Sequence, residues 1–592
     1  MRKILGCFII IMIMITSQIF AGTVYYVDAT NGSDYNDGTS PSTPWKTISK
    51  VNSSSFSPGD SILFKKGEIW REQLIIPSSG SIGNPITFSN YGTGNNPLII
   101  GSNDYDDHAK WTYLGSNKWA TANSSFIHTV KMIWYDTNST PQLCTPVDNE
   151  ADLDTNWEFW YDATNDRVEL YHDVGNPANQ TNGLEIGRRV ICIGSGTNRN
   201  YITIDGIDVK FGNWDGIRFL NTPINITVKN LNANYNGDSG VKIWGAQSAL
   251  IDTVVADYNY YGLSLDTTTS GTLQNCKIEY NTDHGMCLTK TSGVIIQDNE
   301  IGHNGRSAAG GDQFYSCTFQ DNQIYDNEWG GIDLTGGTIK CHDNIVRRNN
   351  FFDHQGQTWS GAVHMCALVP EGYESYNNKV YYNIIYNCKA AIYLGGRCHH
   401  NEVYNNTIYN CTQGIVITYA NGNHAVVPTY NTIRNNIIFT TSDKLIRENV
   451  GESTNTLDYN CYYPDGEDKY AWDGHYYSTF SAFQSASGQD ANSINLVPLF
   501  INPSTHDFHF QSFSPCINAG TDVGLTQDHD GNTVPNGWAV DIGAYEYYET
   551  STPLTASMDA SPGSGFVPLS VSFTGSATGG SEPYTYNWDF GD

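Results

Sequence analysis

CKIEYN at Cys276–Asn281, NEIGHN at Asn299–Asn304, NQIYDN at Asn322–Asn327 and NIVRRN at Asn344–Asn349 are four versions of one pattern. They recur with a period of about 23 residues, and an apolar side chain stands at the third position of each. A fixed period of this size is typical of a solenoid, in which similar coils stack on one another. Related marks lie at Asp205, Lys229, Asp252, Asn383, Asn406 and Asn436.

Each repeat unit has the character of short strands, because its apolar residues alternate with period two and no helical face is present. Asn suits the bends between strands, since it tolerates left-handed φ and its amide can bond the equivalent Asn of the next coil, roughly 4.8 Å away. The pattern resembles right-handed parallel β-helix proteins of the pectate-lyase-like superfamily. We therefore predict an all-β fold with a parallel β-helix of about ten or more coils.

The sequence outside the repeats predicts caps and additions. Residues 1–21 have the charged start and apolar run of a secretory signal peptide. We expect an N-terminal cap and the first coils over 22–100, a small β-rich insertion over 101–190, and the β-helix proper over 191–497. Residues 498–549 resemble the C-terminal cap of such helices. Residues 550–592 are expected to be a linker and a truncated PKD domain, which Pro568–Phe573 and Tyr586–Asp592 resemble.

The formal net charge of −30 argues against nucleic acid as a partner. No apolar run is long enough to span a bilayer, so we expect a secreted or cell-surface monomer that is not inserted in a membrane. The cysteines after the signal peptide are expected to be buried thiols, and Cys388 and Cys411 could stack or bridge. Oxygen-rich Asp34, Asn36 and Asp37 could bind Ca²⁺ or form an Asx-rich turn; no other cofactor is expected.

In β-helix enzymes that act on polysaccharides, the cleft follows the strand after the small residue of each coil. Its outward positions are expected to be Arg218, Lys242, Ser264, Cys287, Asp312 or Gln313, Asp333, His364 and Tyr393. Asp312 and Asp333 would then lie on one face about 5 Å apart. Such a carboxylate pair has split pKa values and suits glycoside hydrolysis, although a solvated pair is the alternative.

Cations and aromatic residues gather in the same coils. Lys290, Arg306 and Arg397 could neutralise a uronate carboxylate or act as the base, as could Arg347 and Arg348 nearby. The coil from Asn344 to Asn383 has 39 residues, about 16 more than its neighbours, and would bring Asp353, His354, Trp359 and His364 towards Asp333. The remaining candidates are aromatic residues two positions before the small residue, which could stack on sugars or fold over the surface: Trp214, Tyr260, Trp329 and Trp359.

Family motifs match only in part. Asn281–Gly285 and Gly310–Asp312 resemble polygalacturonase motifs, but the second Asp, the Gly-His-Gly and the Arg-Ile-Lys of that family are absent. Phe352–His354 resembles the Asp-Pro-His of alginate epimerases without its Pro. The sequence thus predicts a polysaccharide-degrading enzyme. The first hypothesis is a lyase that cleaves an acidic glycan by β-elimination, with Tyr393 and the other aromatic residues binding the substrate. The alternatives are a glycoside hydrolase that uses Asp312 and Asp333, and a non-catalytic glycan-binding or adhesin solenoid.

Overall fold

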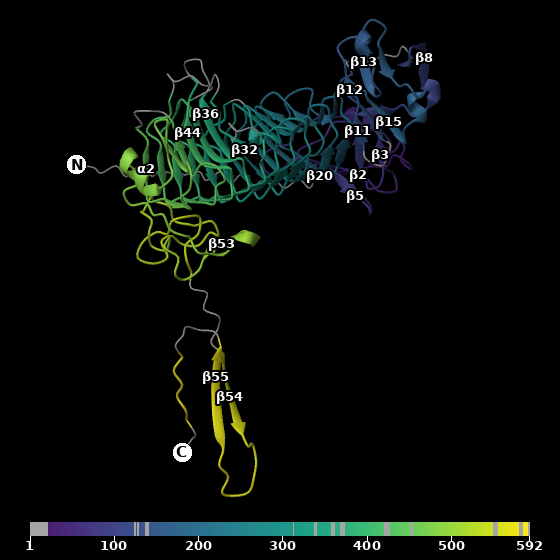
Figure 1. Ribbon diagram of the computed structural model, residues 1–592. Helices are drawn as coiled ribbons and strands as arrows, with labels where there is room; N and C mark the ends of the chain where they lie inside the picture. The colour runs from purple at the N-terminus through teal and green to yellow at the C-terminus, as the bar shows by residue number, and fades with distance from the viewer. Residues whose placement is uncertain are drawn as a thin grey trace, which may run out of the picture.

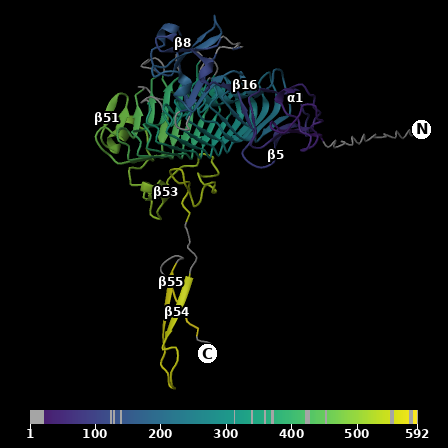
Figure 2. The same cartoon turned by 90° about the vertical axis from the view of Figure 1, so that its right-hand side faces the viewer.

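The computed structural model describes residues 22–122, 126, 130–136, 141–311, 313–336, 340–356, 361–367, 373–419, 427–449, 454–548, 555–578 and 584–589. Most of them wind into one long parallel β-helix, seen from the side in Figures 1 and 2. The predicted fold class is confirmed: nearly all strand pairs within the cylinder are parallel and join consecutive coils.

One face of the cylinder is a 14-stranded sheet, called the cleft sheet below. Its strands are β4 (Leu74–Ile75), β16 (Ile191–Gly194), β19 (Asp215–Phe219), β21 (Ser239–Trp244), β23 (Tyr261–Asp266), β26 (Met286–Thr289), β29 (Ser307–Gly310), β32 (Gly330–Asp333), β36 (Val363–Ala367), β40 (Ala390–Gly396), β44 (Gln413–Thr418), β47 (Ile446–Glu448), β50 (Tyr470–Trp472) and β51 (His475–Tyr477).

Two further runs of strands are joined into a 25-stranded sheet by the long strands β20 and β22. The second face holds β1 (Val24–Val27), β2 (Ser61–Lys65), β5 (Ile86–Tyr91), β17 (Ile202–Asp205), β20 (Ile224–Asn234), β22 (Gln247–Val255), β24 (Thr269–Gln274), β27 (Ser292–Gln297), β30 (Thr318–Gln320), β34 (Ile345–Arg347), β38 (Lys379–Tyr381), β42 (Glu402–Tyr404), β45 (Thr432–Arg434) and β48 (Thr456–Asp458). The third holds β3 (Ile69–Trp70), β6 (Leu98–Ile100), β18 (Asp208–Lys210), β25 (Lys277–Glu279), β28 (Glu300–Gly302), β31 (Gln323–Tyr325), β35 (Asn350–Phe352), β39 (Ile384–Tyr386), β43 (Thr407–Tyr409), β46 (Ile437–Phe439) and β49 (Cys461–Tyr463), and a small sheet joins β33 (Cys341–His342), β37 (Ser375–Tyr376) and β41 (Cys398–His399).

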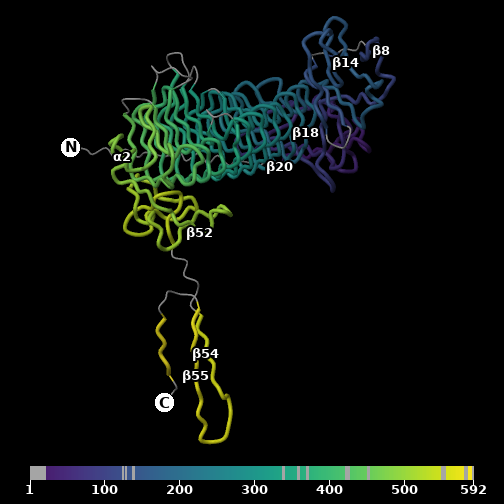
Figure 3. The backbone as a smooth tube through the Cα atoms, viewed as in Figure 1, coloured from purple at the N-terminus to yellow at the C-terminus, as the bar shows by residue number. Residues whose placement is uncertain are grey.

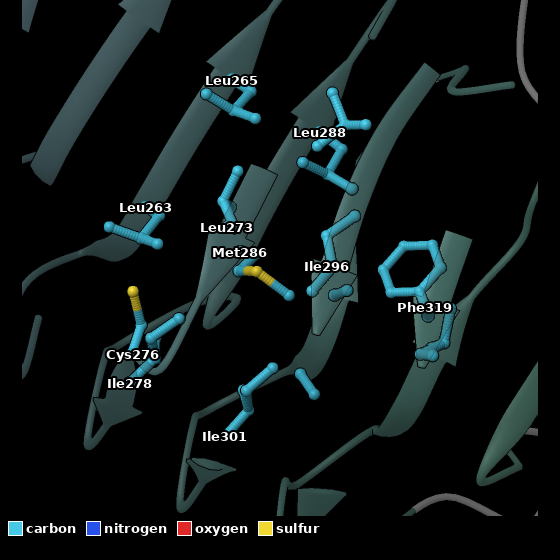
Figure 4. Packing of buried hydrophobic residues seen from close by; sticks show 14 of the residues in the cluster. Leu263, Leu265, Leu273, Cys276, Ile278, Met286, Leu288, Ile296, Ile301 and Phe319 are labelled. Atoms are coloured by element: carbon cyan, nitrogen blue, oxygen red, sulfur yellow. The ribbon is translucent and has the colours of Figure 1, made fainter. Parts of the chain in front are cut away.

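The core is a column of apolar side chains that point inward from all three faces. In Figure 4, Leu263, Met286, Ile278 and Ile301 from neighbouring coils stack in this interior. Each is essentially inaccessible to water. The parallel register aligns like residues of successive coils, for example Ile301 with Ile324 and Ile324 with Phe351, so the period of the sequence becomes a continuous core.

Buried asparagines tie the coils together at the bends. The Asn322 side chain accepts hydrogen bonds from Asn299 and donates one to the Asn349 Oδ1 at 2.8 Å. Equivalent bonds continue to Asn383, Asn406, Asn436 and Asn460. A second ladder runs through Asn236, Asn259, Asn281, Asn304 and Asn327, and a third through Asn344, Asn378, Asn401, Asn431 and Asn455.

The ladder corrects one register that the sequence analysis assigned. The partner of Asn322 is Asn349, 27 residues on, and Asn349 pairs with Asn383, 34 residues on. Asn344, which the repeat count placed in this column, belongs to the third ladder and bonds Asn378. The extra length is therefore shared between two coils. The two Asn columns of the repeat lie five positions apart, so a coil with added residues could be aligned to either.

Both ends of the cylinder are covered. Helix α1 (Ile48–Asn52) buries Ile48 and Val51 at the N-terminal end. Helix α2 (Phe480–Ser487) buries Phe480 and Phe483 beside Tyr462 and Tyr470 at the other end. Such caps remove open strand edges and exposed core.

The insertion is a separate small β structure with its own apolar core. It has two sheets, which are antiparallel except for the parallel pair β12–β13. The first contains β7 (Ser102–Asp104), β10 (Ile133–Asp136), β11 (Pro141–Leu143) and β15 (Gly183–Gly187). The second contains β8 (Trp111–Gly115), β9 (Lys118–Thr121), β12 (Thr145–Pro146), β13 (Glu158–Asp162) and β14 (Arg167–Tyr171). Short 3₁₀ turns lie at His108–Lys110, Glu150–Asp152 and Pro177–Asn179. Figure 3 shows this part rising from the N-terminal end of the cylinder.

The C-terminal part packs on the third face. Phe508 and Ile542 contact Ile384, Ile437 and Cys461 of the cylinder. Its elements are β52 (Phe500–Asn502), a 3₁₀ turn at Pro503–Thr505 and β53 (Asp507–Phe510); further on, β54 (Thr555–Ser561) and β55 (Ser572–Thr578) form an antiparallel hairpin with exposed side chains.

The twelve cysteines of the described residues are free thiols, and Cys388 and Cys411 stack without a bridge. In the described part of the chain, no helix has the length and apolar character needed to cross a membrane.

Candidate functional site

The outward positions of the cleft sheet form one column across the coils. Strand pairing aligns Arg218, Lys242, Ser264, Cys287 and Gly310 in succession. The pairing of Ala309 with Ile332 then places Asp333 after Gly310, and His364, Tyr393, Val416 and Arg447 follow.

This register corrects the expectation that Asp312 or Gln313 occupies the column in the fifth coil. Gly310 stands there, two residues before Asp312, because Ala309 pairs with Met286 and Ala308 therefore takes the place of the small residue. Gln313 is buried in a turn with φ of 80°. Asp312 lies outside the described residues, so its pairing with Asp333 stays a prediction.

The missing side chain at Gly310 makes room for the imidazole of His284. A Cβ added at Gly310 would stand 2.6 Å from the His284 Cε1. His284 Nδ1 lies 3.3 Å from the backbone N of Ser307 and 3.4 Å from its carbonyl oxygen, and Nε2 lies 3.5 Å from the Asp283 carboxylate. Burial lowers the pKa of His284, so the ring is neutral at physiological pH.

Asp333 and His364 form a charged pair beside this gap. His364 Nδ1 lies 3.1 Å from the Asp333 Oδ1, and the Thr335 hydroxyl donates to the same oxygen. Burial opposes ionisation of Asp333, yet the His364 charge and these hydrogen bonds hold its pKa below 3.8. Burial likewise disfavours the His364 cation, but Asp333 outweighs it and raises the pKa of His364 to about 10. One quarter of the Asp333 side chain remains exposed, so an ionised carboxylate is accessible on the outer face of the cleft sheet.

The paired charges make the stability depend on pH. Because the pKa of His364 is raised, its charge stabilises the fold fully below pH 6.5, and this contribution is lost as the pH rises through about 10. We expect His364→Gln to lower the unfolding temperature at neutral pH, and its deficit relative to the wild type to shrink as the pH rises towards 10 and beyond. Thermal unfolding followed by circular dichroism measures this, with exposed His475→Gln as the control. Parallel curves for wild type and His364→Gln across the alkaline range would contradict it.

A row of side chains, called the edge below, follows the bend that precedes the cleft sheet. Backbone hydrogen bonds align Tyr260, Asp283, Arg306 and Trp329 in successive coils. The Tyr260 hydroxyl donates to Asp283 at 3.0 Å, and the Arg306 guanidinium lies 3.5 Å from the same carboxylate. Arg306 also covers the Trp329 ring at 4.3 Å. The expected aromatic column is thus interrupted by charged residues.

Trp214 continues this edge towards the insertion. Lys131 of the insertion lies over the Trp214 ring at 3.3 Å, and its backbone N–H donates to Asn213. Trp214 is therefore partly covered by the insertion. Trp359 lies outside the described residues, and its expected place on the edge stays a prediction. Tyr393 is buried with its ring 5.0 Å from that of His364, so it supports the imidazole more than it offers a surface.

Several expected residues are not brought to Asp333. Lys290 is exposed in the bend after β26, and Arg397 is half-buried in the bend after β40. Arg347 and Arg348 bond Gln320 and Asp321 on the second face. The expectation for His354 is wrong: it is buried in the second asparagine ladder, where its Nδ1 accepts from Asn327, and burial lowers its pKa to about 4.

An open cavity of about 490 Å³ lies beside the edge of Arg306 and Trp329. Tyr280 and His303, stacked at 4.8 Å, form one wall, and Asp326 pairs with His303 at 2.8 Å. The lining residues Gly305 and Glu328 immediately precede Arg306 and Trp329 in the chain. Its polar groups and aromatic wall could therefore receive part of a ligand bound in the cleft.

The candidate calcium loop is held by its own hydrogen bonds. Asp34 accepts from the backbone of Lys46 and Thr47 and from the Thr47 hydroxyl. The Asp37 carboxylate accepts from Thr39 and Thr43, and the Asn36 amide donates to a backbone carbonyl. These bonds fit an Asx-rich turn, and the described residues contain no group of three or more acidic, His or Cys ligands suited to a metal. Calcium binding here stays a prediction.

Comparisons with known proteins agree with the fold. Residues 215–365 match a family model described as right handed beta helix region. A lacto-N-biosidase of Bifidobacterium longum subsp. longum is 43% identical over 76 residues, which is 12% of this chain and 5% of that protein. This chain therefore matches only a small part of that relative's length.

Solved structures of similar shape have low sequence identity. XylC in complex with xylose is 15% identical, with a TM-score of 0.48 over 74% of this chain and 83% of that one. The lacto-N-biosidase of family GH136 from Eubacterium ramulus is 12% identical, with a TM-score of 0.33 over 74% and 67%. Pectate lyase Pel9A is 13% identical, with a TM-score of 0.33 over 89% and 96%. These likenesses concern the fold alone.

The sequence analysis missed three contributors to the site: Asp283, His284 and the gap at Gly310. Asp283 and His284 were visible within the Asn281–Gly285 motif, but its spacing does not show that their side chains meet the next coils. Gly310 contributes because it has no side chain, which leaves room for the His284 ring. Only the strand register shows that these two residues meet.

Proposed function

We propose that this chain is a secreted carbohydrate-active enzyme, and specifically a glycoside hydrolase in which Asp333 is the catalytic anion. The observation that carries the proposal is an ionised carboxylate, held by His364 and Thr335, that is partly exposed on the outer face of the cleft sheet, beside Gly310 and the His284 ring. Glycoside hydrolysis develops positive charge at the anomeric carbon, and an ionised carboxylate stabilises that charge or attacks the carbon directly.

The second carboxyl group of the mechanism is assigned to Asp312, which follows Gly310 by two residues in the sequence. It would protonate the oxygen of the leaving sugar. Asp283 is not assigned this role, because its carboxylate already accepts from the Tyr260 hydroxyl and lies 3.5 Å from Arg306.

The surroundings of Asp333 suit a sugar without charge. Asp333 and Asp283 each lie beside a basic side chain, His364 and Arg306 respectively, so each carboxylate has a partner of opposite formal charge. Exposed Tyr260 offers aromatic surface to the C–H faces of sugar rings, and the cavity beside Arg306 and Trp329 offers hydrogen-bonding groups. The relative named lacto-N-biosidase, matched over 76 residues, supports this class of substrate.

Beta-elimination of an acidic glycan is the second candidate. The cationic His364 and Arg306 favour it, since they could neutralise a uronate carboxylate. The adjacent Asp333 carboxylate repels a uronate carboxylate. We therefore rank elimination as less favoured than hydrolysis. A non-catalytic glycan-binding solenoid is the remaining alternative, and a PKD-like domain over residues 550–592 is proposed as an accessory to any of the three.

Product analysis on a glycan panel tests the proposal. The panel contains aryl xylosides, aryl lacto-N-biosides, neutral polysaccharides, polygalacturonate and alginate. We expect new reducing ends without the ultraviolet absorbance of an unsaturated uronate. Unsaturated products would replace hydrolysis by elimination, and retention in an affinity gel without any product would favour the solenoid that only binds.

A further inference from the structure

The C-terminal part of the chain contains a cavity that is separate from the cleft. Its volume is about 660 Å³, and Ile501, Tyr547 and Tyr548 contribute to its walls together with Gln511, Ser512 and Asn532. This part packs on Ile384 and Ile437 of the third face, away from the cleft sheet, and β53 marks it below the cylinder in Figure 1.

The charged groups of this cavity already have hydrogen-bond partners. His509 lies between two carboxylates, with its Nδ1 2.7 Å from Asp507 and its Nε2 2.9 Å from Asp530. These partners raise the pKa of His509 to about 9, so it is a cation that balances them in part. Both carboxylate oxygens of Glu546 accept backbone N–H groups, from Asn536 and Asp541.

This balance selects a class of ligand. A metal cation would have to displace the hydrogen bonds that hold the carboxylates, and an anion would meet Asp530 and Glu546. A purely apolar ligand would leave the polar walls unsatisfied. A neutral sugar fits, because its hydroxyl groups can bond the carboxylate and amide groups while its C–H face packs on tyrosine rings.

Exposed apolar side chains in the same part of the chain support a ligand surface. Ile501 of the cavity wall is 53% exposed and Tyr548 is 38% exposed, while Phe513, next to Ser512 in the chain, is 88% exposed. Large apolar side chains left in water at this density commonly mark a binding surface.

We propose that this cavity is a second carbohydrate-binding site, which holds a neutral sugar unit of a polysaccharide while the cleft acts elsewhere on the polymer. Binding at two places raises the effective concentration of the polymer at the cleft. The inference is independent of whether the cleft hydrolyses or eliminates.

Affinity electrophoresis tests the site on the full chain carrying Asp333→Asn, which keeps the polymer intact. The gels contain xylan, galactan or glucomannan. We expect retardation by at least one of them, and about tenfold weaker binding after Tyr548→Ala, which removes a ring, or Ser512→Trp, which fills the cavity. Ser512 and Tyr548 are exposed, so the fold should tolerate both changes.

Tyr113→Ala, at an exposed tyrosine of the insertion, is the matched control and should bind as before. The proposal is overturned if none of the three polymers retards the chain, or if retardation survives both cavity variants. It is also overturned if Trp329→Ala in the cleft abolishes retardation. If the wild type shows no catalysis but the Asp333→Asn chain is still retarded, the proposed function is refuted while the second binding site is supported.

Discussion

Replacing Asp333 by Asn is expected to lower kcat on the panel substrates by on the order of 10³-fold or more, with little change in fold. The amide keeps the size of the side chain and can still accept a hydrogen bond from Thr335 or His364. It removes the negative charge that would stabilise or attack the anomeric carbon. Initial rates on aryl glycosides measure the loss, and circular dichroism checks the fold.

The matched control is Asp266→Asn, at the end of β23 in the same sheet, where the carboxylate accepts from Thr267. Its rates should equal those of the wild type. If Asp333 is the nucleophile, azide should restore part of the activity of Asp333→Ala and yield a glycosyl azide, because a small anion can enter the vacated space. An Asp333→Asn enzyme that retains most of its activity would end the catalytic assignment.

The largest effect on stability is expected from Asn322→Ala in the first asparagine ladder. Asn322 is fully buried and makes four side-chain hydrogen bonds: it accepts from the backbone and amide of Asn299 and donates to Ile296 and Asn349. Alanine leaves these groups buried without partners, which should cost roughly 3–5 kcal/mol. The damage should be local, since each coil contacts only its neighbours.

Hydrogen exchange measured by mass spectrometry resolves this locality better than a single unfolding midpoint. Peptides that contain Asn299, Asn322 and Asn349 should lose protection, while those of the insertion should keep it. Asn232→Ala is the control, because its amide also bonds a neighbouring coil, at Asp208, but at an exposed position. It should change stability by no more than about 0.5 kcal/mol. Equal effects of Asn322→Ala and Asn232→Ala would refute the role assigned to burial.

The candidate site was only partly predictable from the sequence. The strand pattern placed Asp333, His364 and Tyr393 in one outward column, and pairing in the structure puts them there. The pattern failed in the fifth coil, where Gly310 rather than Asp312 or Gln313 stands in line. It also sent His354 towards the cleft, although this histidine replaces an asparagine in a buried ladder.

The sequence by itself determined the parallel β-helix, because a repeated strand pattern with Asn at the bends can bury its apolar side only by stacking in register. Tertiary structure alone decided which residues meet. Added residues in two coils moved the partner of Asn322 from Asn344 to Asn349, and the absent side chain of Gly310 let the His284 ring enter from the preceding coil. The physical reason is that a period fixes spacing along the chain, whereas contact between coils depends on hydrogen-bonded register and on the space each side chain leaves.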